Sequence, residues 1–198
     1  MSCKNKVIII PGLGDETRVL GYITRQWKRY GLDLVVYSVG WHDGKESFPL
    51  KLSRFVQMID ELVKNGNKVS LVGTSAGGSA VVNAFIERKS KIHRVINICG
   101  RLKVGPTTGY RSFDKKTSSS PAFAESVRLC EKGIKLLTAT DRKKIMTVHA
   151  KFGDELVPPE TTMINGAHNT YIPTMEHVVS ISAALTIFSK SLTFFLLE

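Results

Sequence analysis

Residues 68–78 read Lys-Val-Ser-Leu-Val-Gly-Thr-Ser-Ala-Gly-Gly, an apolar run that leads into Gly-x-Ser-x-Gly and then into a helical stretch. Strand, tight turn and helix in this order are the setting in which the motif presents a nucleophilic serine. The serine then adopts strained backbone, and glycines at positions 73 and 77 leave room for the neighbouring strand and helix. The five-residue pattern also recurs by chance as an ordinary turn, so the prediction that Ser75 is a nucleophile needs partner groups elsewhere.

The composition is that of an ordinary globular protein, with 198 residues, 42% hydrophobic and 23% charged. This length suffices for a sizeable core, so we expect one domain over residues 1–198. Cys3, Cys99 and Cys130 are widely spaced and form no Cys-x-x-Cys pair, so we predict neither a disulfide framework nor a metal site. Only four apolar residues precede Pro11, too few for a signal peptide, and a cytoplasmic location is the default expectation.

The chain is basic, with 28 Lys and Arg against 17 Asp and Glu and a net charge of +11. Much of the excess lies between residues 101 and 151. Basic surfaces attract nucleic acid, anionic membranes or acidic substrates without selecting among them. No nucleic-acid-binding motif accompanies these charges, and aromatic residues are not interleaved with them. We interpret them mostly as a solvated face, with weak association with anionic surfaces as the alternative.

Short β-rich runs alternate with longer helical stretches along the chain. Several of the runs are continuous Val, Ile and Leu, which is typical of parallel strands covered on both faces. The pattern predicts an α/β fold, a three-layer sandwich of about six mostly parallel strands with helices on both faces. The expected strands are 6–10, 34–37, 68–72, 94–99, 145–149 and 161–164, and the expected helices are 17–30, 51–65, 75–89, 121–138 and 173–190.

Two segments interrupt this alternation. Residues 101–120 contain Gly-Pro, a further Gly and three consecutive Ser without a convincing period, and such an insertion after a strand is usually functional. This segment is therefore a candidate lid or insert. The apolar tail, residues 178–197, approaches membrane-spanning length, but Lys190 and repeated Ser and Thr interrupt it. We expect a buried terminal helix with an apolar extension.

A nucleophilic serine needs a base and a carboxylate that orients the base, and these groups follow the serine in chain order. Asp154 lies in the loop that leaves the expected strand 145–149, where such a carboxylate belongs. Glu155 is its near neighbour, and Asp141 precedes the strand. Asp154 also suits a simple role as a turn or capping residue before Pro158.

We predict His168 as the base, because it follows the expected last strand, 161–164, within a turn. His42 also follows a strand, but it precedes the serine in the chain. His177 falls inside the expected last helix, which indicates a surface position. His93 and His149 lie at strand ends that do not fit the required order.

Backbone N–H groups must also stabilise the negative charge that develops on the carbonyl oxygen during acyl transfer. The residue after the serine, Ala76, offers one such group at the start of a helix, where the dipole favours negative charge. The loop 11–15 after the first strand is rich in glycine, and we choose the Leu13 N–H as the second donor of this oxyanion hole. The loop does not match a phosphate-binding loop, because the third glycine and the lysine of such motifs are missing.

Taken together, residues 8–14, the motif at 73–77, the loop 153–158 and Gly166-Ala-His168 make the chain resemble a small, minimal lipase or esterase of the α/β-hydrolase superfamily. The resemblance implies Ser75 as nucleophile, His168 as base and acid, Asp154 as orienting carboxylate, and no cofactor. Asp154 and His168 are closer in sequence than is usual in the superfamily. Glu155 or Glu160 therefore stays an alternative for the acid.

The resulting expectation is a serine hydrolase that cleaves an ester or thioester of a small-molecule acyl substrate through an acyl-enzyme. Trp41 and the segment 101–120 are candidates for the substrate pocket and its cover, although a packed aromatic and a surface loop explain them equally well. A catalytically idle binding protein on the same scaffold is the alternative, favoured if Ser75 and His168 lie far apart. The sequence leaves the oligomeric state open.

Overall fold

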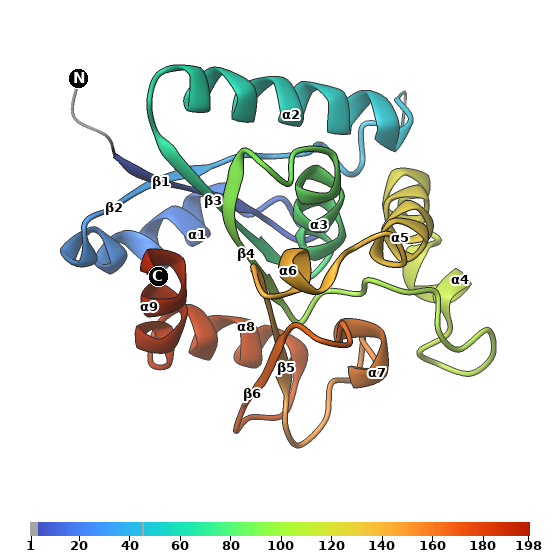
Figure 1. The fold of residues 1–198 in the computed structure, drawn as a ribbon. Helices are drawn as coiled ribbons and strands as arrows, with labels where there is room; N and C mark the ends of the chain where they lie inside the picture. The colour runs from blue at the N-terminus through green and yellow to red at the C-terminus, as the bar shows by residue number, and fades with distance from the viewer. Residues whose placement is uncertain (1–3, 45) are drawn as a thin grey trace.

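The computed structural model describes residues 4–44 and 46–198, and within them six strands form one parallel sheet between two layers of helices (Figure 1). Neighbouring strands are parallel throughout, in the order β2-β1-β3-β4-β5-β6. The predicted α/β three-layer architecture is confirmed. The strands are β1 (Asn5–Ile10), β2 (Leu32–Val36), β3 (Lys68–Thr74), β4 (Ile92–Ile98), β5 (Ile145–Ala150) and β6 (His168–Ile172).

Helices cover both faces of the sheet (Figure 1). One face carries α2 (Phe48–Lys64), α3 (Gly77–Glu87) and α5 (Pro121–Ile134), and the other carries α1 (Thr17–Thr24), the 3₁₀ helix η1 (Arg25–Tyr30), α8 (His177–Leu185) and α9 (Ser189–Leu197). The short helices α4 (Phe113–Thr117), α6 (Ala139–Arg142) and α7 (Pro159–Thr162) lie in the connections.

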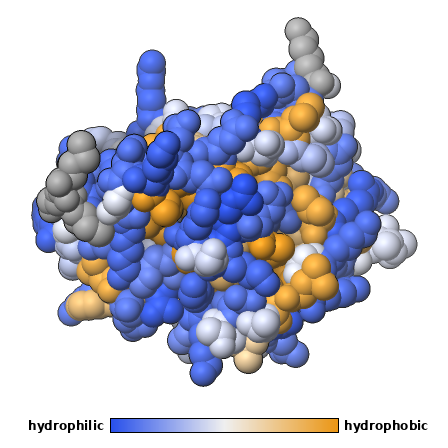
Figure 2. All heavy atoms as spheres, turned by 45° about the horizontal axis from the view of Figure 1, so that its top comes forward, coloured by the Kyte–Doolittle hydropathy of each residue, from blue (hydrophilic) through white to orange (hydrophobic). Residues whose placement is uncertain are grey.

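Each central strand supplies apolar side chains to both faces, which is why continuous apolar runs mark it in the sequence. In β1, for example, Ile8 and Ile10 pack in the core beneath α2 and α3, whereas Val7 and Ile9 pack beneath η1 and α9. The outward surface of α2 is polar, and Figure 2 shows this side of the molecule as mostly hydrophilic, with apolar patches between. The thiol of Cys99 is buried in the core beneath η1 and α9, and Cys3 lies outside the described residues.

The sixth strand was predicted in the wrong place. Residues 161–164 belong to α7 and the turn after it, because Pro158 and Pro159 fix backbone angles that suit the start of a helical turn. The last strand is instead β6, the segment His-Asn-Thr-Tyr-Ile at 168–172. Its Thr, Tyr and Ile favour extended backbone. Gly166, with a φ of +81°, precedes β6, and Pro173 follows it.

Residues 101–120 contain one short helix, α4, and both ends of the segment are buried. The apolar tail forms two helices rather than one, α8 and α9, with Leu192 and Phe195 of α9 in the core. In the described chain, no single helix is long and apolar enough to cross a membrane; α8 and α9 meet that criterion only as a pair, bent by 57°.

Candidate active site

Ser75 occupies the sharp turn between β3 and α3, with a φ of +51° in the left-handed region. Its N–H donates to the Ile98 carbonyl at 3.0 Å, and its own carbonyl accepts from Gly78 N–H at 3.0 Å. A side chain at Gly77 would collide with the carbonyl of Ile10, and one at Gly73 would collide with that of Gly77. The glycines of the motif are therefore required by close backbone approach, as the sequence predicted.

The side chain of His177 lies beside this serine. Its Nε2 is 2.8 Å from Ser75 Oγ, and its Nδ1 is 2.7 Å from Asp154 Oδ2. His177 is the first residue of α8 and only 3% exposed. Its backbone is fixed from two sides: the His177 N–H donates to Glu155 Oε2 at 3.0 Å, and the Glu176 carboxylate caps the helix by accepting from the N–H groups of Val178 and Val179.

Asp154 is buried in the loop after β5 and uses both carboxylate oxygens. Oδ2 faces His177, whereas Oδ1 accepts from the N–H groups of Leu156 and Val157, each at 2.8 Å. Burial raises the pKa of Asp154, but the hydrogen bond and the charge of His177, together with the hydrogen bonds from Val157 and Leu156, outweigh it and hold the pKa below its usual range. The group is therefore a carboxylate at neutral pH.

The structure contradicts the prediction that His168 is the partner of Ser75. His168 begins β6, is exposed, and its ring packs 5.2 Å from that of Phe195. The last strand ends at Ile172 rather than at 164, and the first histidine after it is His177. The prediction of a surface position for His177 is therefore wrong, because it depends on a last strand at 161–164.

The other candidates for the acid and the base do not take part in the hydrogen bonds that join Ser75, His177 and Asp154. Glu160 is exposed at α7, and Glu155 contacts His177 only at the backbone N–H, so Asp154 is the carboxylate that orients the imidazole. His42 is exposed and lies 3.3 Å from the Ser119 carbonyl through Nδ1.

The loop after β1 approaches the serine closely. A Cβ at Gly12 would lie 2.9 Å from Ser75 Cβ, and Leu13 lines a cavity together with Ser75. Ala76 is fully buried at the N-terminal end of α3. Within residues 4–44 and 46–198, neither the Leu13 N–H nor the Ala76 N–H has a hydrogen-bond acceptor. Both predicted donors are thus near the serine and available to a ligand.

Trp41 does not form the pocket that was predicted for it. Its side chain is 1% exposed and packs in the core, stacked on Phe48 at 6.0 Å and edge-on to Phe123 at 5.9 Å. Its Nε1–H donates to the Pro11 carbonyl at 3.2 Å. A buried indole needs both apolar packing and a hydrogen-bond acceptor. Trp41 finds its acceptor at Pro11 and so fixes the backbone just before Leu13.

An apolar groove of about 380 Å³ leads away from Ser75 and His177. Val19, Leu20 and Ile23 of α1 form one wall, and Val178 and Ile181 of α8 form the opposite wall. Such a mixture of apolar walls and a few polar groups at one end is typical of small-molecule sites. The groove, rather than Trp41, is the candidate for the binding of an apolar substrate chain.

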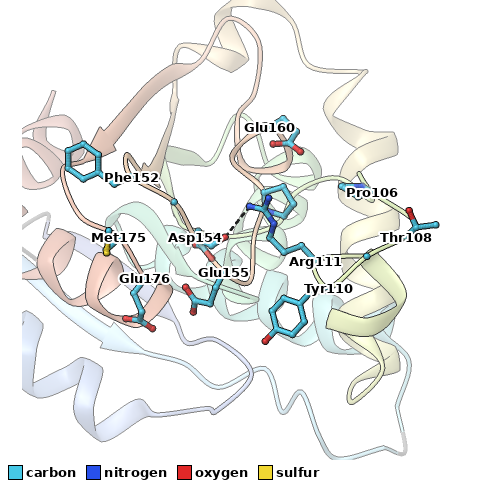
Figure 3. A pocket seen from close by; sticks show the side chains of 13 residues that line it. Pro106, Thr108, Tyr110, Arg111, Phe152, Asp154, Glu155, Glu160, Met175 and Glu176 are labelled. Atoms are coloured by element: carbon cyan, nitrogen blue, oxygen red, sulfur yellow. Dashed lines mark hydrogen bonds between the residues drawn. The ribbon is translucent and has the colours of Figure 1, made fainter.

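A larger cavity of about 750 Å³ also has Asp154 in its lining (Figure 3). Its lining includes Glu155, Glu160 and Arg111, whose Nη1 donates to the Asp154 carbonyl at 3.3 Å. Neither Ser75 nor His177 lines this cavity, so its size alone does not make it the reaction site. No group of three His, Cys, Asp or Glu side chains able to hold a metal ion occurs in the described part of the chain.

No protein-family model and no curated protein matches the sequence. Solved structures do match along most of the chain. A monoacylglycerol lipase from Paleococcus ferrophilus has a TM-score of 0.68 at 16% identity, over 99% of this chain and 96% of that one. The esterase domain of a Rhodothermus marinus protein has a TM-score of 0.62 at 14% identity, over 98% and 87%. A thioesterase domain from the curacin biosynthetic pathway has a TM-score of 0.62 at 11% identity, over 98% and 91%. With this sheet order and this turn at Ser75, the chain has the α/β-hydrolase fold.

Proposed function

We propose that this protein is a serine hydrolase that cleaves carboxylic esters or thioesters. The observation that carries the proposal is the continuous hydrogen-bonded chain from Ser75 Oγ through His177 to Asp154, with separations of 2.8 and 2.7 Å. A serine hydroxyl is a weak nucleophile until a positioned base takes its proton, and this arrangement supplies the base and the group that orients it. The names of the similar structures, which are lipases, esterases and thioesterases, support the same reaction class.

The first half of the reaction transfers the acyl group to the enzyme. The carboxylate of Asp154 accepts from Nδ1–H of His177, so Nε2 is free to accept the proton of Ser75 as Oγ attacks the carbonyl carbon. The carbonyl oxygen becomes negative and is stabilised by the Leu13 and Ala76 N–H groups. The bond from the carbonyl carbon to the leaving oxygen or sulfur then breaks, and the leaving group takes the proton from Nε2.

In the second half, water releases the acyl group. Nε2 of His177 takes a proton from water as the water oxygen adds to the acyl carbon, and the same two N–H groups stabilise the negative charge again. The bond to Ser75 Oγ breaks, and Oγ regains its proton from Nε2. The products are the carboxylic acid and the alcohol or thiol, with the enzyme unchanged.

The apolar groove between α1 and α8 supports a substrate with an apolar chain. Aliphatic side chains of α1 and α8 make up much of its lining, which also includes Asp15 and Glu16, and Ser75 lines it too, so an alkyl chain placed there would keep its ester carbonyl beside Ser75. Burial of each methylene contributes about 0.8 kcal/mol. In two series of esters, one with acyl chains and one with alcohol chains of increasing length, activity should therefore rise in at least one series until the groove is filled.

A fluorophosphonate probe tests the proposal directly, because it reacts with activated serines. We expect labelling of the wild-type protein and loss of labelling and of 4-nitrophenyl ester hydrolysis in Ser75→Ala, with a fall of about 10⁶-fold in kcat. The exposed Ser118→Ala is the matched control and should behave as wild type. Labelling that persists in Ser75→Ala refutes the assignment, and a folded wild-type protein without labelling or turnover supports the idle binding protein instead.

A further inference from the structure

A second, small cavity lies beside the serine. It has a volume of about 60 Å³ and shares Ser75, Leu13 and Leu156 with the apolar groove, so the two spaces meet at the nucleophile. Unlike the groove, the small cavity is lined by two cationic side chains, Arg101 and Lys116. The site therefore has one apolar and one cationic side.

Arg101 is 1% exposed, and its guanidinium is poorly satisfied by the protein. Nη2 donates to the Arg111 carbonyl at 2.5 Å, and Cζ lies 6.0 Å from the ring centre of Phe113. The buried Nε and Nη1 atoms have no hydrogen-bond partner anywhere in residues 4–44 and 46–198. A buried donor left without an acceptor is costly, and more so when it is charged, so this arrangement is expected where a ligand supplies the acceptor.

In the part of the chain that the structure describes, the positive charge at this cavity has no direct ion pair. Within the described chain, no carboxylate lies within ion-pair distance of Arg101 or Lys116. The ammonium of Lys116 instead lies 3.6 Å from the ring centre of Tyr110. Burial lowers the pKa of Arg101, Glu160 acts in the opposite direction from a distance, and Arg111 adds to the lowering. Arginine nevertheless stays charged at neutral pH.

We propose that this cavity binds a carboxylate of the substrate, on the side of the scissile bond opposite the apolar chain. The inference rests on the proposed function, since it places the ester carbonyl at Ser75. A cavity of about 60 Å³ has room for about four water-sized spheres, which suits the three heavy atoms of a carboxylate. The substrate class is then an ester that is apolar at one end and carries a carboxylate close to the carbonyl at the other end.

Two matched pairs of esters test this class and show which side carries the carboxylate. Hexyl butyrate and monohexyl succinate differ by a carboxylate on the acyl part. Ethyl hexanoate and carboxymethyl hexanoate differ by a carboxylate on the alcohol part. Titration of the released acid gives the rate of hydrolysis of each ester. We expect the wild-type kcat/KM for the carboxylate member of one pair to be about 10- to 100-fold higher than for its partner, the range of a hydrogen bond to a charged group.

The preference should depend on the cavity and not on the net charge of the protein. Arg101→Met and Lys116→Met should each reduce the preference by about tenfold or more, whereas Lys115→Met, on the exposed side of α4, should leave it unchanged. The preference should also persist at high salt, which screens surface charges more than buried ones. If Arg101→Met fails to fold by circular dichroism, Lys116→Met and the wild-type preference decide.

The outcomes separate this inference from the proposed function. Labelling by fluorophosphonate together with equal rates on both members of each pair overturns the carboxylate site and leaves the hydrolase. A preference that Lys115→Met or high salt abolishes also overturns it, because surface charge then explains the effect. Absence of labelling and turnover in folded wild-type protein overturns the proposed function, and the carboxylate site with it.

Discussion

Replacement of Asp154 by Asn should remove nearly all of the hydrolytic activity. The hydrogen bonds of Asp154 explain why. In the Asn variant, the two N–H donors from Leu156 and Val157 require the amide oxygen at the position of Oδ1. The amide NH₂ group then faces Nδ1 of His177, which has to become an acceptor. The imidazole proton moves to Nε2, the atom that should accept the proton of Ser75.

The wrong tautomer removes the base without changing the volume of the side chain. In an unrelated serine protease, the same substitution costs about 10⁴-fold in kcat. Four factors of ten correspond to about 5.4 kcal/mol of transition-state stabilisation. We expect a loss of this order for Asp154→Asn, measured as initial rates of ester hydrolysis, with a parallel fall in the rate of fluorophosphonate labelling.

Glu155→Gln is the matched control for this prediction. Among the described residues, Glu155 accepts only from the His177 backbone N–H, and a glutamine oxygen can accept the same bond, so kcat should change less than about tenfold. Circular dichroism should show both variants folded. A kcat for Asp154→Asn within tenfold of wild type refutes the tautomer reasoning. If Glu155→Gln is inactive while Asp154→Asn is active, Glu155 rather than Asp154 is the carboxylate that orients the imidazole.

Three further predictions follow from individual side chains. His177→Ala should lose about 10⁶-fold in kcat and His168→Ala only a small factor; the reverse result in ester hydrolysis would restore the assignment made from sequence. Burial and nearby basic side chains lower the pKa of His93 to about 4 from its usual 6.5. The unfolded chain therefore binds the extra proton first, and the free energy of unfolding should fall as the pH drops from 6.5 towards 4. In urea titrations at several pH values, His93→Gln should reduce this dependence of the free energy of unfolding on pH. If the dependence is unchanged, other groups cause it. Trp41→Ala should cost about 3–5 kcal/mol of stability, as expected for a large core aromatic; a loss below about 1 kcal/mol in the same titration would contradict its place in the core.

Local sequence signals account for the two predicted residues, Ser75 and Asp154, that the structure places in one hydrogen-bonded chain with His177. The turn at Ser75 requires small residues within a five-residue window, and Ile145, Met146 and Val148 mark the strand before Asp154, so both positions follow from short-range signals. The position of His177 depends on which of two weak segments, 161–164 or 168–172, pairs with β5. That choice is made by tertiary pairing rather than by propensity.

Two signals near the last strand could have corrected the error. Pro158-Pro159 favours a helical start over a strand, and Thr170-Tyr171-Ile172 before Pro173 has the composition of an edge strand. The role of Trp41 could not be predicted in the same way, because a core indole and a pocket indole have the same sequence pattern. Arg101 gave no sequence signal at all, since only burial distinguishes it from the other basic residues nearby.

The proposed acid and base, Asp154 and His177, are held together at the margin of the sheet, whereas Ser75, the proposed nucleophile, follows the central strand β3. Within residues 4–44 and 46–198, β6 pairs only with β5. Backbone hydrogen bonds continue past both strands: the Lys151 N–H donates to the Ile172 carbonyl at 2.9 Å, and the Glu176 N–H donates to the Gly153 carbonyl at 3.2 Å. Edge elements open with less free energy than central ones. Fraying of this margin would thus carry the imidazole away from the serine while the central strands stay folded. Turnover should disappear at a lower urea concentration than far-ultraviolet circular dichroism, and coincident transitions would show that the margin unfolds only with the whole.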